Sequence, residues 1–327
     1  MYTDSIRIKN FKSIKTLSLN DCKRINLLIG PPNVGKSNIM EALSLFDIPF
    51  HGSKNYYSDI IKPKMRIERA QQLFPYGNIK EPIIIETNHE TLSLKLDSQR
   101  LQPTFELEIK KDGEIIYDSA TPLKTDVSPE VLVYYYPRFF NFRASSLSFL
   151  RPPYGSNLMQ IIKDNPELVD SLKSILKEYG YFCVFDSSAE EYKAMQQDEE
   201  GNVYLVPFEA LADSIKHLLF FKAAVVSNHD KIICFEEPES NTFPPYTTAL
   251  VDSILDSVNG NQYFISTHSS YIISHLLENS HDDLAIYKIG FKDGFTECYR
   301  LTDEEIATVI DYGMDLLFNI EAFPLKQ

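Results

Sequence analysis

The sequence has 327 residues, of which 43% are hydrophobic and 24% are charged, and these are ordinary values for a globular protein. The formal net charge of -14 excludes a wholly basic nucleic-acid coat, although a local basic patch can coexist with an acidic total. The most apolar run, residues 217–226, is too short to cross a bilayer, and the N-terminus lacks the apolar stretch of a signal peptide. Four cysteines lie scattered without CxxC spacing, which suits a reducing cytosol. We therefore expect a cytoplasmic protein with no membrane partner.

The first fifty residues predict strands, a tight loop and a helix. Residues 5–11 and 15–19 have the pattern of two short strands, and residues 24–29 that of a buried strand. A glycine-containing loop follows at residues 30–37, and an amphipathic helix at residues 38–46.

The loop reads GPPNVGKS and fits the pattern G-x-x-x-x-G-K-[ST]. Gly30 and Gly35 allow the backbone to curl, so that its N–H groups point at a phosphate. Lys36 would place a cation on the β- and γ-phosphate oxygens of ATP, and the Ser37 hydroxyl would ligate Mg²⁺. The motif lies between a predicted strand and a predicted helix, which is the context that a phosphate-binding loop requires.

The middle of the chain changes to alternating strands. Antiparallel strands are predicted at residues 81–86, 92–96, 104–110 and 114–118, with a hairpin turn at Asp112-Gly113. The apolar, aromatic strand at residues 131–136 is interpreted as buried core rather than as a base-stacking surface. Residues 158–179 have helical periodicity, and residues 191–207 have the pattern of a second hairpin.

The last third alternates helices and strands, which is typical of an α/β fold. Helices are predicted at residues 213–226 and 245–258, and strands at residues 231–235 and 262–266. A hairpin turns at Asp293-Gly294, and a closing helix starts with Thr302 and Glu305 in capping-box spacing.

Two of these apolar strands end in polar side chains. The strand at 231–235 leads into Glu236 and Glu237, which could serve the Mg²⁺ shell and the attacking water, respectively. The strand at 262–266 leads into Thr267 and His268, and this histidine could donate a hydrogen bond to the γ-phosphate.

Taken in this order, the motifs resemble the ABC-type ATPase heads of the SMC, RecF and OLD lineage. More narrowly, the chain is similar to bacterial "AAA family ATPase" proteins of phage-defence and genome-maintenance contexts, without coiled coil or nuclease domain. The resemblance spans nearly the whole chain. Its motifs are IKNFKSI at 8–14, the loop at 30–38, PPYGSNL at 152–158, FEEPES at 235–240 and STHS at 266–269.

The resemblance implies one α/β P-loop NTPase head over residues 1–327. Its nucleotide-binding core would be residues 1–50 and 205–300, with an antiparallel β lobe at 80–145 and an inserted helical and β lobe at 150–200. Glu237 would be the catalytic base, His268 the γ-phosphate switch, and Ser37 and Glu236 the Mg²⁺ ligands. The implied nucleotide-binding residues are Lys12, Ser13, Gly30, Asn33, Gly35, Lys36, Ser37 and Asn38.

The resemblance also implies a homodimer in the ATP state, with two ATP molecules sandwiched between protomers. Residues 240–244 would form the loop that touches the opposite subunit. The expected output is control of a separately encoded effector, in phage defence or genome maintenance. A RecF-like DNA clamp, with DNA as partner, and an ATP sensor with little turnover remain alternatives.

The sequence departs from the family pattern in three places. Glu236 stands where aspartate is usual, which puts the hydrolysis rate in doubt. The signature-like stretch 211–215 has Ala212 in place of the serine that would contact the γ-phosphate, so weakened activation across the dimer is expected. A glutamine linking the nucleotide to the helical lobe is not evident, and residues 136–138 are the candidate region.

Overall fold

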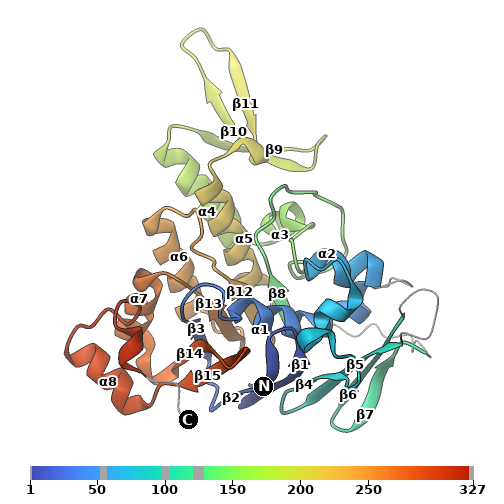
Figure 1. Cartoon of the computed structure of the whole chain (residues 1–327). Coiled ribbons are helices and arrows are strands. Elements are labelled where there is room, and N and C mark those ends of the chain that lie inside the picture. The colour runs from blue at the N-terminus through green and yellow to red at the C-terminus, as the bar shows by residue number, and fades with distance from the viewer. Residues whose placement is uncertain (1, 52–56, 98–103, 121–128, 324–327) are drawn as a thin grey trace. The chain divides into compact units, whose positions relative to one another are not determined.

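The computed structural model describes residues 2–51, 57–97, 104–120 and 129–323, which fall into two compact units (Figure 1). The first unit comprises residues 1–133, 231–236 and 262–327, and the second comprises residues 134–230 and 237–261. Stretches far apart in the sequence therefore build each unit, and strand pairing between such stretches holds the first one together.

One sheet of the first unit is antiparallel and has six strands in the order β2-β1-β4-β5-β6-β7. Burial alternates along its strands, most regularly in β5, because successive side chains point to opposite faces and only one face packs inward. The strands are β1 (Ser5–Phe11), β2 (Ile14–Asn20), β4 (Ile83–Glu86), β5 (Glu90–Asp97), β6 (Thr104–Lys111) and β7 (Glu114–Asp118).

The other sheet of this unit carries the motif-bearing strands, in the order β15-β14-β3-β13-β12-β8. β3 pairs in parallel with β13 and β14, and β13 pairs in parallel with β12. β3 and β13 are buried along their whole length, as expected for central parallel strands with both faces covered. The strands are β3 (Ile25–Ile29), β8 (Val131–Tyr134), β12 (Ile232–Glu236), β13 (Gln262–Ser266), β14 (Leu284–Lys292) and β15 (Phe295–Arg300).

The helices of the first unit are short. α1 (Lys36–Leu43) lies against β1 and β12 and continues as a 3₁₀ helix, Ser44–His51. The others are a π-helix at Tyr57–Ile61, α2 (Lys62–Lys64), α7 (Ser270–Ser280), α8 (Asp303–Asp311) and 3₁₀ turns at Ala70–Leu73, Pro75–Gly77, His281–Asp283 and Ile320–Ala322. Thr302 and Glu305 form the predicted capping box at the start of α8.

The second unit combines helices with a three-stranded sheet in the order β11-β10-β9. α5 packs against α3, α4 and α6, and α4 packs against β9. The elements are α3 (Leu158–Asp164), α4 (Pro166–Glu178), β9 (Phe182–Asp186), β10 (Glu191–Gln197), β11 (Val203–Pro207), a 3₁₀ turn at Phe208–Ala210, α5 (Asp213–Ser227) and α6 (Pro244–Leu255).

The structure differs from the sequence prediction at three elements. The helix expected over 158–179 is two helices, because Asn165 adopts an extended backbone and Pro166 cannot donate to a preceding carbonyl, so it begins α4 instead. β9 and α7 were not predicted; α7 follows Ser269, whose hydroxyl accepts a hydrogen bond from Ile272 N–H and caps it.

The antiparallel sheet is also larger than the lobe predicted at residues 80–145. β1 pairs with β4, so residues 5–20 belong to this sheet. β8, predicted within the lobe, instead lies beside β12 at the end of the other sheet. The assignment of residues 1–50 and 205–300 to one nucleotide-binding core remains a prediction.

Candidate functional site

The predicted phosphate loop leaves β3 and enters α1, as the motif requires. Gly30 has a φ of 150°, and a Cβ there would lie 2.2 Å from the carbonyl oxygen of Ile289 on β14. Gly35 has a φ of 103°, and a Cβ there would lie 2.1 Å from Thr296 Oγ1. Both positions therefore exclude any side chain, and the loop keeps a curl in which backbone N–H groups can face an anion.

Lys36 curls back over this loop. Its ammonium donates hydrogen bonds to the carbonyl oxygens of Gly30 and Pro31, both at 2.8 Å, and the residue is only 6% exposed. Ser37, next in the first turn of α1, is exposed, and so is Asn33, which has a left-handed φ of 64°. The loop thus holds one cation inside its curl and presents a hydroxyl at its rim.

A relay of hydrogen bonds supports the loop from the protein side. Asn38 Nδ2 donates to Ser13 Oγ at 2.7 Å, and Thr296 Oγ1 donates to the carbonyl oxygen of Val34 at 2.9 Å. Ser13 and Thr296 are joined at 2.6 Å, so the Ser13 hydroxyl is the donor that completes the relay. Thr296 was not predicted from the sequence, because its approach to the loop depends on the pairing of β14 and β15.

Removing the Thr296 hydroxyl should weaken this support. Thr296→Val keeps the shape but leaves the Val34 carbonyl and the Ser13 hydroxyl without their partner, which costs about 1–3 kcal/mol for buried groups. We expect urea unfolding to show this loss, and ATP affinity to fall with it. Thr308→Val, at an exposed position of α8, is the matched control. Unchanged stability and affinity would contradict the supporting role.

Lys12 has a different environment from the one predicted. Its ammonium forms an ion pair with the Glu41 carboxylate on α1 and donates to the Met65 carbonyl oxygen at 2.8 Å. Glu41 is buried, and this burial raises its pKa, although the neighbouring Lys12 acts in the opposite direction. Contact between Lys12 and nucleotide stays a prediction, and it requires the ammonium to leave Glu41.

Three strand ends meet at one edge of the parallel sheet. In register, Leu28 of β3 lies beside Ser266 of β13, and Ser266 lies beside Glu236 of β12. The phosphate loop, the Thr267–His268 pair and Glu236 follow or end these strands, so the fold brings the predicted residues to the same edge. Ser266 Oγ is buried there and has no hydrogen-bond partner among the described residues.

His268 occupies an exposed position between β13 and α7. The Ser269 N–H donates to Thr267 Oγ1 at 3.0 Å, and Ser269 caps α7, so the backbone on both sides of the histidine is ordered. The location agrees with the prediction, while its contact with a γ-phosphate remains a proposal.

The oxygen donors of this edge suit Mg²⁺. The fold places Ser37 at the start of α1 and Glu236 at the end of β12, and α1 lies against β12. Hydroxyl and carboxylate oxygens are the protein ligands that Mg²⁺ takes beside substrate phosphates. The glycine curl and this donor set therefore fit a magnesium–nucleotide complex.

Glu237 begins the part of the chain that belongs to the second unit. Its φ of 43° is uncommon for a residue with a side chain, and such conformations concentrate at functional sites. Ser240 Oγ donates to Glu237 Oε2 at 3.2 Å, which orients this carboxylate.

The signature-like stretch, also in the second unit, precedes α5. Ala212 is the N-cap of α5 and supplies no side-chain cap. Ser214 Oγ accepts from the Phe243 N–H at 3.0 Å and donates to the Asn241 carbonyl at 3.3 Å. The start of α5 is therefore tied to the loop over 240–244 that was predicted to touch an opposite subunit.

His217 is a residue of this unit that the sequence prediction missed. It is buried on α5 and stacks on Tyr136, with ring centroids 3.4 Å apart. Burial lowers the pKa of His217 to about 4, so it is neutral at pH 7. Tyr136 belongs to residues 136–138, the candidate region for the linking glutamine. The stacked pair of Tyr136 and His217 is a contact between this region and α5.

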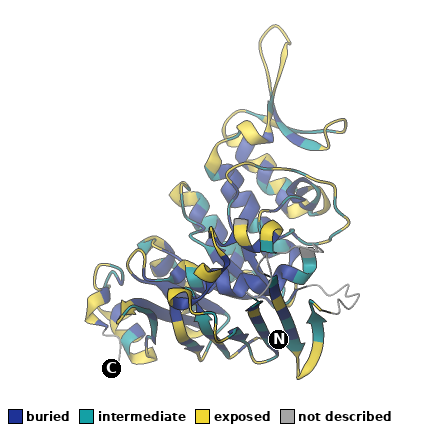
Figure 2. Ribbon diagram, turned by 45° about the vertical axis from the view of Figure 1, so that its right-hand side comes forward, coloured by how far each residue is buried: buried dark blue, intermediate teal, exposed yellow. Residues whose placement is uncertain are grey.

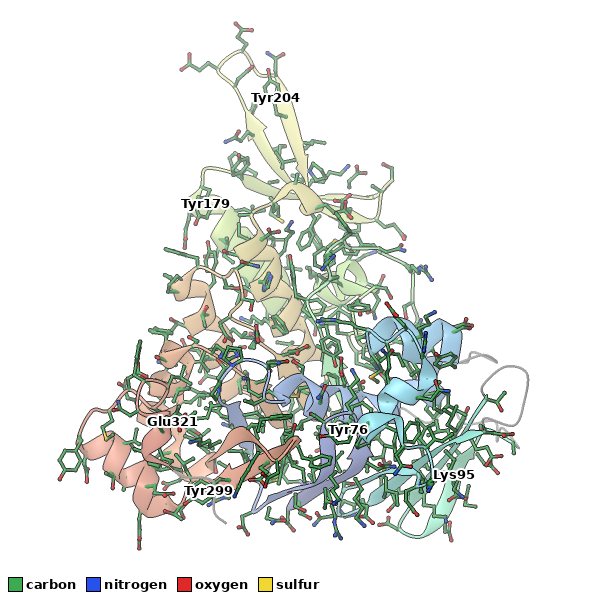
Figure 3. The ribbon with its side chains drawn as sticks, viewed as in Figure 1. Tyr76, Lys95, Tyr179, Tyr204, Tyr299 and Glu321 are labelled. Atoms are coloured by element: carbon green, nitrogen blue, oxygen red, sulfur yellow. The ribbon has the colours of Figure 1, made fainter. Side chains whose placement is uncertain are left out.

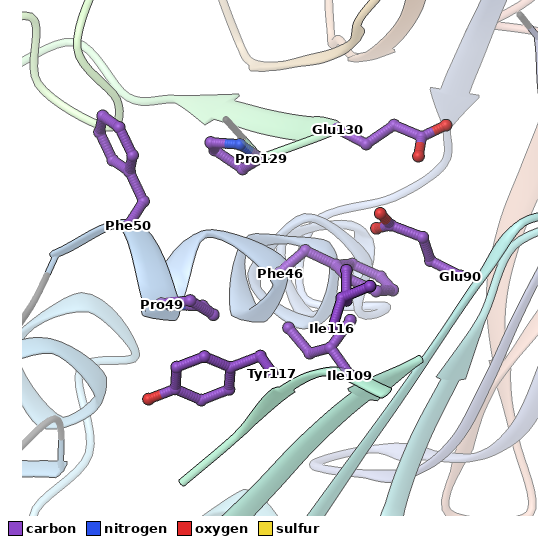
Figure 4. A pocket seen from close by; sticks show the side chains of 9 residues that line it. All are labelled: Phe46, Pro49, Phe50, Glu90, Ile109, Ile116, Tyr117, Pro129 and Glu130. Carbon is purple, nitrogen blue, oxygen red and sulfur yellow. The ribbon is translucent and has the colours of Figure 1, made fainter. Parts of the chain in front are cut away.

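The pocket in Figure 4 is separate from the phosphate loop, because none of its lining residues belongs to that loop. Its wall includes Glu90 and Glu130, whose carboxylates face each other (Figure 4), and Lys111 lies 3.2 Å from Glu130. Burial, followed by the charge of Glu130, raises the pKa of Glu90 to about 7.

Stability should therefore depend on pH near neutrality. Folded Glu90 keeps its proton up to about pH 7, whereas unfolded Glu90 loses it near pH 4.5, so the free energy of unfolding should fall as pH rises between these values. Glu90→Gln should flatten this slope and add about 3 kcal/mol relative to wild type at pH 8. Urea unfolding at pH 5 and pH 8 measures it, with Glu114→Gln at an exposed position as control. An unchanged slope would contradict the assignment.

Among the described residues, none of the helices combines the length and the hydropathy needed to span a bilayer.

Comparisons with known proteins bear on the family of this chain. A model of the AAA ATPase domain family matches residues 1–198 and 76–273. A Helicobacter pylori protein named ATP/GTP phosphatase is 25% identical over 97% of this chain and 97% of its own length. The DNA replication and repair protein RecF of Caldanaerobacter subterraneus subsp. tengcongensis is 24% identical over 59% of this chain and 52% of its own.

Solved structures show the same fold at low identity. An SMC head bound to the C-winged helix domain of ScpA has a TM-score of 0.56 and 14% identity, covering 93% of this chain and 99% of its own. An SMC head with an extended coiled coil, bound to the C-terminal domain of ScpA from Pyrococcus furiosus, has a TM-score of 0.52 and 10% identity, covering 95% and 99%. The chain therefore belongs to the AAA ATPase domain family and has the α/β fold of an SMC/RecF-like, P-loop ABC ATPase head.

Proposed function

We propose that this ATPase head is a switch that binds and hydrolyses ATP and closes into a dimer to control a separate effector protein. The observation that carries the proposal is the shared sheet edge, where the phosphate loop, Glu236 and His268 follow parallel strands in register. The reaction would be ATP and water to ADP and phosphate. The effector would be a separately encoded protein that acts in phage defence or in genome maintenance.

Each residue has a distinct part in the proposed reaction. Lys36 would exchange its two carbonyl partners for β- and γ-phosphate oxygens, which are stronger acceptors because they are charged. Ser37 and Glu236 would hold Mg²⁺, which supplies charge neutralisation at the phosphates. Glutamate has one methylene more than the usual aspartate, and a bridging water would absorb this difference.

Water activation is assigned to Glu237. Its carboxylate, oriented by Ser240, would accept a proton from the attacking water. His268 would donate a hydrogen bond to the γ-phosphate and so sense whether it is present. Asn33, Asn38 and Ser13 would shape the loop, with Ser13 acting through the relay to Thr296 rather than by touching nucleotide.

Dimer closure would place the start of one protomer's α5 against the other protomer's γ-phosphate. Ala212 cannot supply a hydroxyl there, but the first N–H groups of α5 and its dipole still attract an anion. Slow turnover is the expected consequence. If turnover is negligible, the protein is an ATP sensor.

Phosphate release from ATP tests the reaction. We expect the purified protein to release phosphate from ATP in the presence of Mg²⁺. This release should stop when EDTA chelates the Mg²⁺. ATP binding without phosphate release under both conditions would favour the sensor.

DNA binding is the second candidate function, because RecF is among the relatives. A clamp would bind duplex DNA only with ATP present, and its affinity would fall steeply with salt as counterions are released. A filter-binding titration at two salt concentrations, with ATP and with ADP, separates the clamp from the effector switch.

The switch role of His268 predicts a separation of binding from turnover. His268→Ala should leave ATP affinity nearly intact and slow hydrolysis, because its contact with the γ-phosphate is made in the closed state. Calorimetric titration with ATP and ADP, beside a phosphate-release assay, measures both quantities. His275→Ala, on the following helix, is the control. An equal loss of ADP affinity would show that His268 is structural instead.

A further inference from the structure

The sheet of the second unit has one buried and one exposed face. Tyr192 and Ala194 of β10 point to the buried face, where Tyr192 packs edge-on against Phe185 of β9. Residues that alternate with these two point the other way, so Met195 lies on the exposed face between its register partners Phe182 and Leu205. This exposed face, here termed the outer face, carries the apolar side chains of Phe182, Val184, Met195, Val203, Leu205 and Pro207. Lys193 lies on the same face between Val184 and Pro207, where it forms an ion pair with Asp186.

Apart from the Lys193–Asp186 ion pair, the outer face is mostly apolar, and much of it is accessible. Phe182 is 64% exposed, Val203 53% and Leu205 49%. Figure 2 shows the hairpin of β10 and β11 largely exposed, and Figure 3 shows its side chains, with Tyr204 labelled. Single exposed apolar residues are ordinary, but a contiguous row across three strands is typical of an interaction surface.

The edge of this sheet is also open to pairing. β11 is one of the two terminal strands and pairs, within the described residues, with β10 on one side alone. Edge strands are commonly protected by Lys or by a central Pro. β11 itself contains no Lys or Arg, and its one Pro, Pro207, stands at its very end; Lys193 belongs to the neighbouring β10. The N–H and C=O groups along this edge can therefore accept one further strand.

The tip of the hairpin between β10 and β11 is acidic, so it favours a positively charged binding partner. Asp198, Glu199 and Glu200 are all exposed there. Hydrogen bonds from Asn202 fix the turn and lower the pKa of Asp198, so its carboxylate stays ionised. A nucleic acid would be repelled by three carboxylates, and a second copy of this chain would bring the same negative charges and a net charge of -14.

We propose that the outer face and the β11 edge bind an extended apolar segment of a separate protein, with Lys or Arg residues of that segment on the acidic tip. The segment would add a strand beside β11 and cover Leu205 and Val203 with its side chains. This inference rests on the proposed control of a separate effector, and it assigns the surface on which that effector docks.

The test uses the full-length protein and peptides selected from a random phage-displayed library. Selected peptides should alternate apolar residues and carry Lys or Arg near one end. Their affinity, measured by fluorescence anisotropy, should fall at least tenfold in Leu205→Asp and in the double variant Glu199→Lys/Glu200→Lys. Val258→Asp, at a position 95% exposed on the same unit, and Glu304→Lys/Asp311→Lys on α8 are matched controls that should bind normally.

Several outcomes would overturn the assignment. The absence of such peptides after selection is one, and binding that is equal in the surface variants and the controls is another. Wild-type self-association that Leu205→Asp abolishes would show instead that a second copy covers the face, and DNA binding abolished by Leu205→Asp would also overturn the proposal. Circular dichroism of each variant checks that the fold is retained.

The same variants separate this inference from the ATPase switch. Leu205→Asp should hydrolyse ATP at the wild-type rate, because the outer face contains none of the proposed nucleotide residues. Peptide binding without any ATP hydrolysis would support the surface and reject the switch. Hydrolysis with no selective peptide binding would support the ATPase and reject the surface.

Discussion

Glu237→Gln is expected to slow ATP hydrolysis by roughly 10²- to 10⁴-fold, the range that general-base catalysis contributes. Glutamine retains the size of the side chain and one carbonyl oxygen that Ser240 can still reach. It cannot take a proton from water, so the chemical step slows while ATP still binds. Single-turnover phosphate release, together with an ATP titration, measures the two effects separately.

Two further variants sharpen this prediction. Glu209→Gln, at an exposed position of the same unit, should hydrolyse ATP normally. Normal turnover in Glu237→Gln would move the base elsewhere, and the same change at Glu239 would then be the next candidate. A loss of ATP affinity in Glu237→Gln would argue that the carboxylate binds nucleotide rather than water.

Lys36→Ala is expected to weaken ATP binding by about 3 kcal/mol, or roughly a hundredfold, as for a lost charge-assisted hydrogen bond pair. The substitution removes the cation enclosed by the loop and leaves the Gly30 and Pro31 carbonyls facing any bound phosphate. ADP affinity should fall as well, because the β-phosphate contact is also lost. Calorimetry with both nucleotides measures this.

Lys62→Ala, at an exposed lysine of the same unit, is the matched control and should bind as wild type does. Lys36→Arg keeps the charge but cannot fit its larger head between two carbonyls at 2.8 Å, and should rescue binding only in part. Unchanged ATP affinity in Lys36→Ala would reject the phosphate-loop assignment.

Local sequence patterns were sufficient to predict the central strands, the phosphate loop and one helix cap. β3 and β13 are runs of apolar residues long enough to be strands, and the loop between β3 and α1 has a motif whose spacing reflects backbone geometry. The capping box at Thr302 was predictable for the same reason, since both of its hydrogen bonds join residues three apart.

Contacts between distant residues were not predictable from these patterns. Thr296 reaches Val34 across 262 positions of sequence, and Lys12 reaches Glu41 across 29. β9 is a five-residue strand at one end of its sheet, and only its pairing with β10 distinguishes it from a short apolar run in a loop. The stacking of Tyr136 on His217 depends on how α5 packs within its unit.

The division of the chain into two compact units was likewise not predictable from the sequence pattern. Glu236 and Glu237 are adjacent in the chain, yet they fall in different compact units. A motif identifies both carboxylates equally well, but only the fold separates the residue at the end of a buried strand from the one that follows it in a left-handed conformation.

The mass of Glu237→Gln in solution tests the proposed switch most directly, because the γ-phosphate persists in this variant. Light scattering after size-exclusion chromatography should give a dimer with ATP and Mg²⁺, and a monomer with ADP and Mg²⁺. Wild type should show the dimer only transiently. A Glu237→Gln protein that binds ATP and has lost turnover, yet keeps one mass in both nucleotides, would contradict nucleotide-dependent dimerisation.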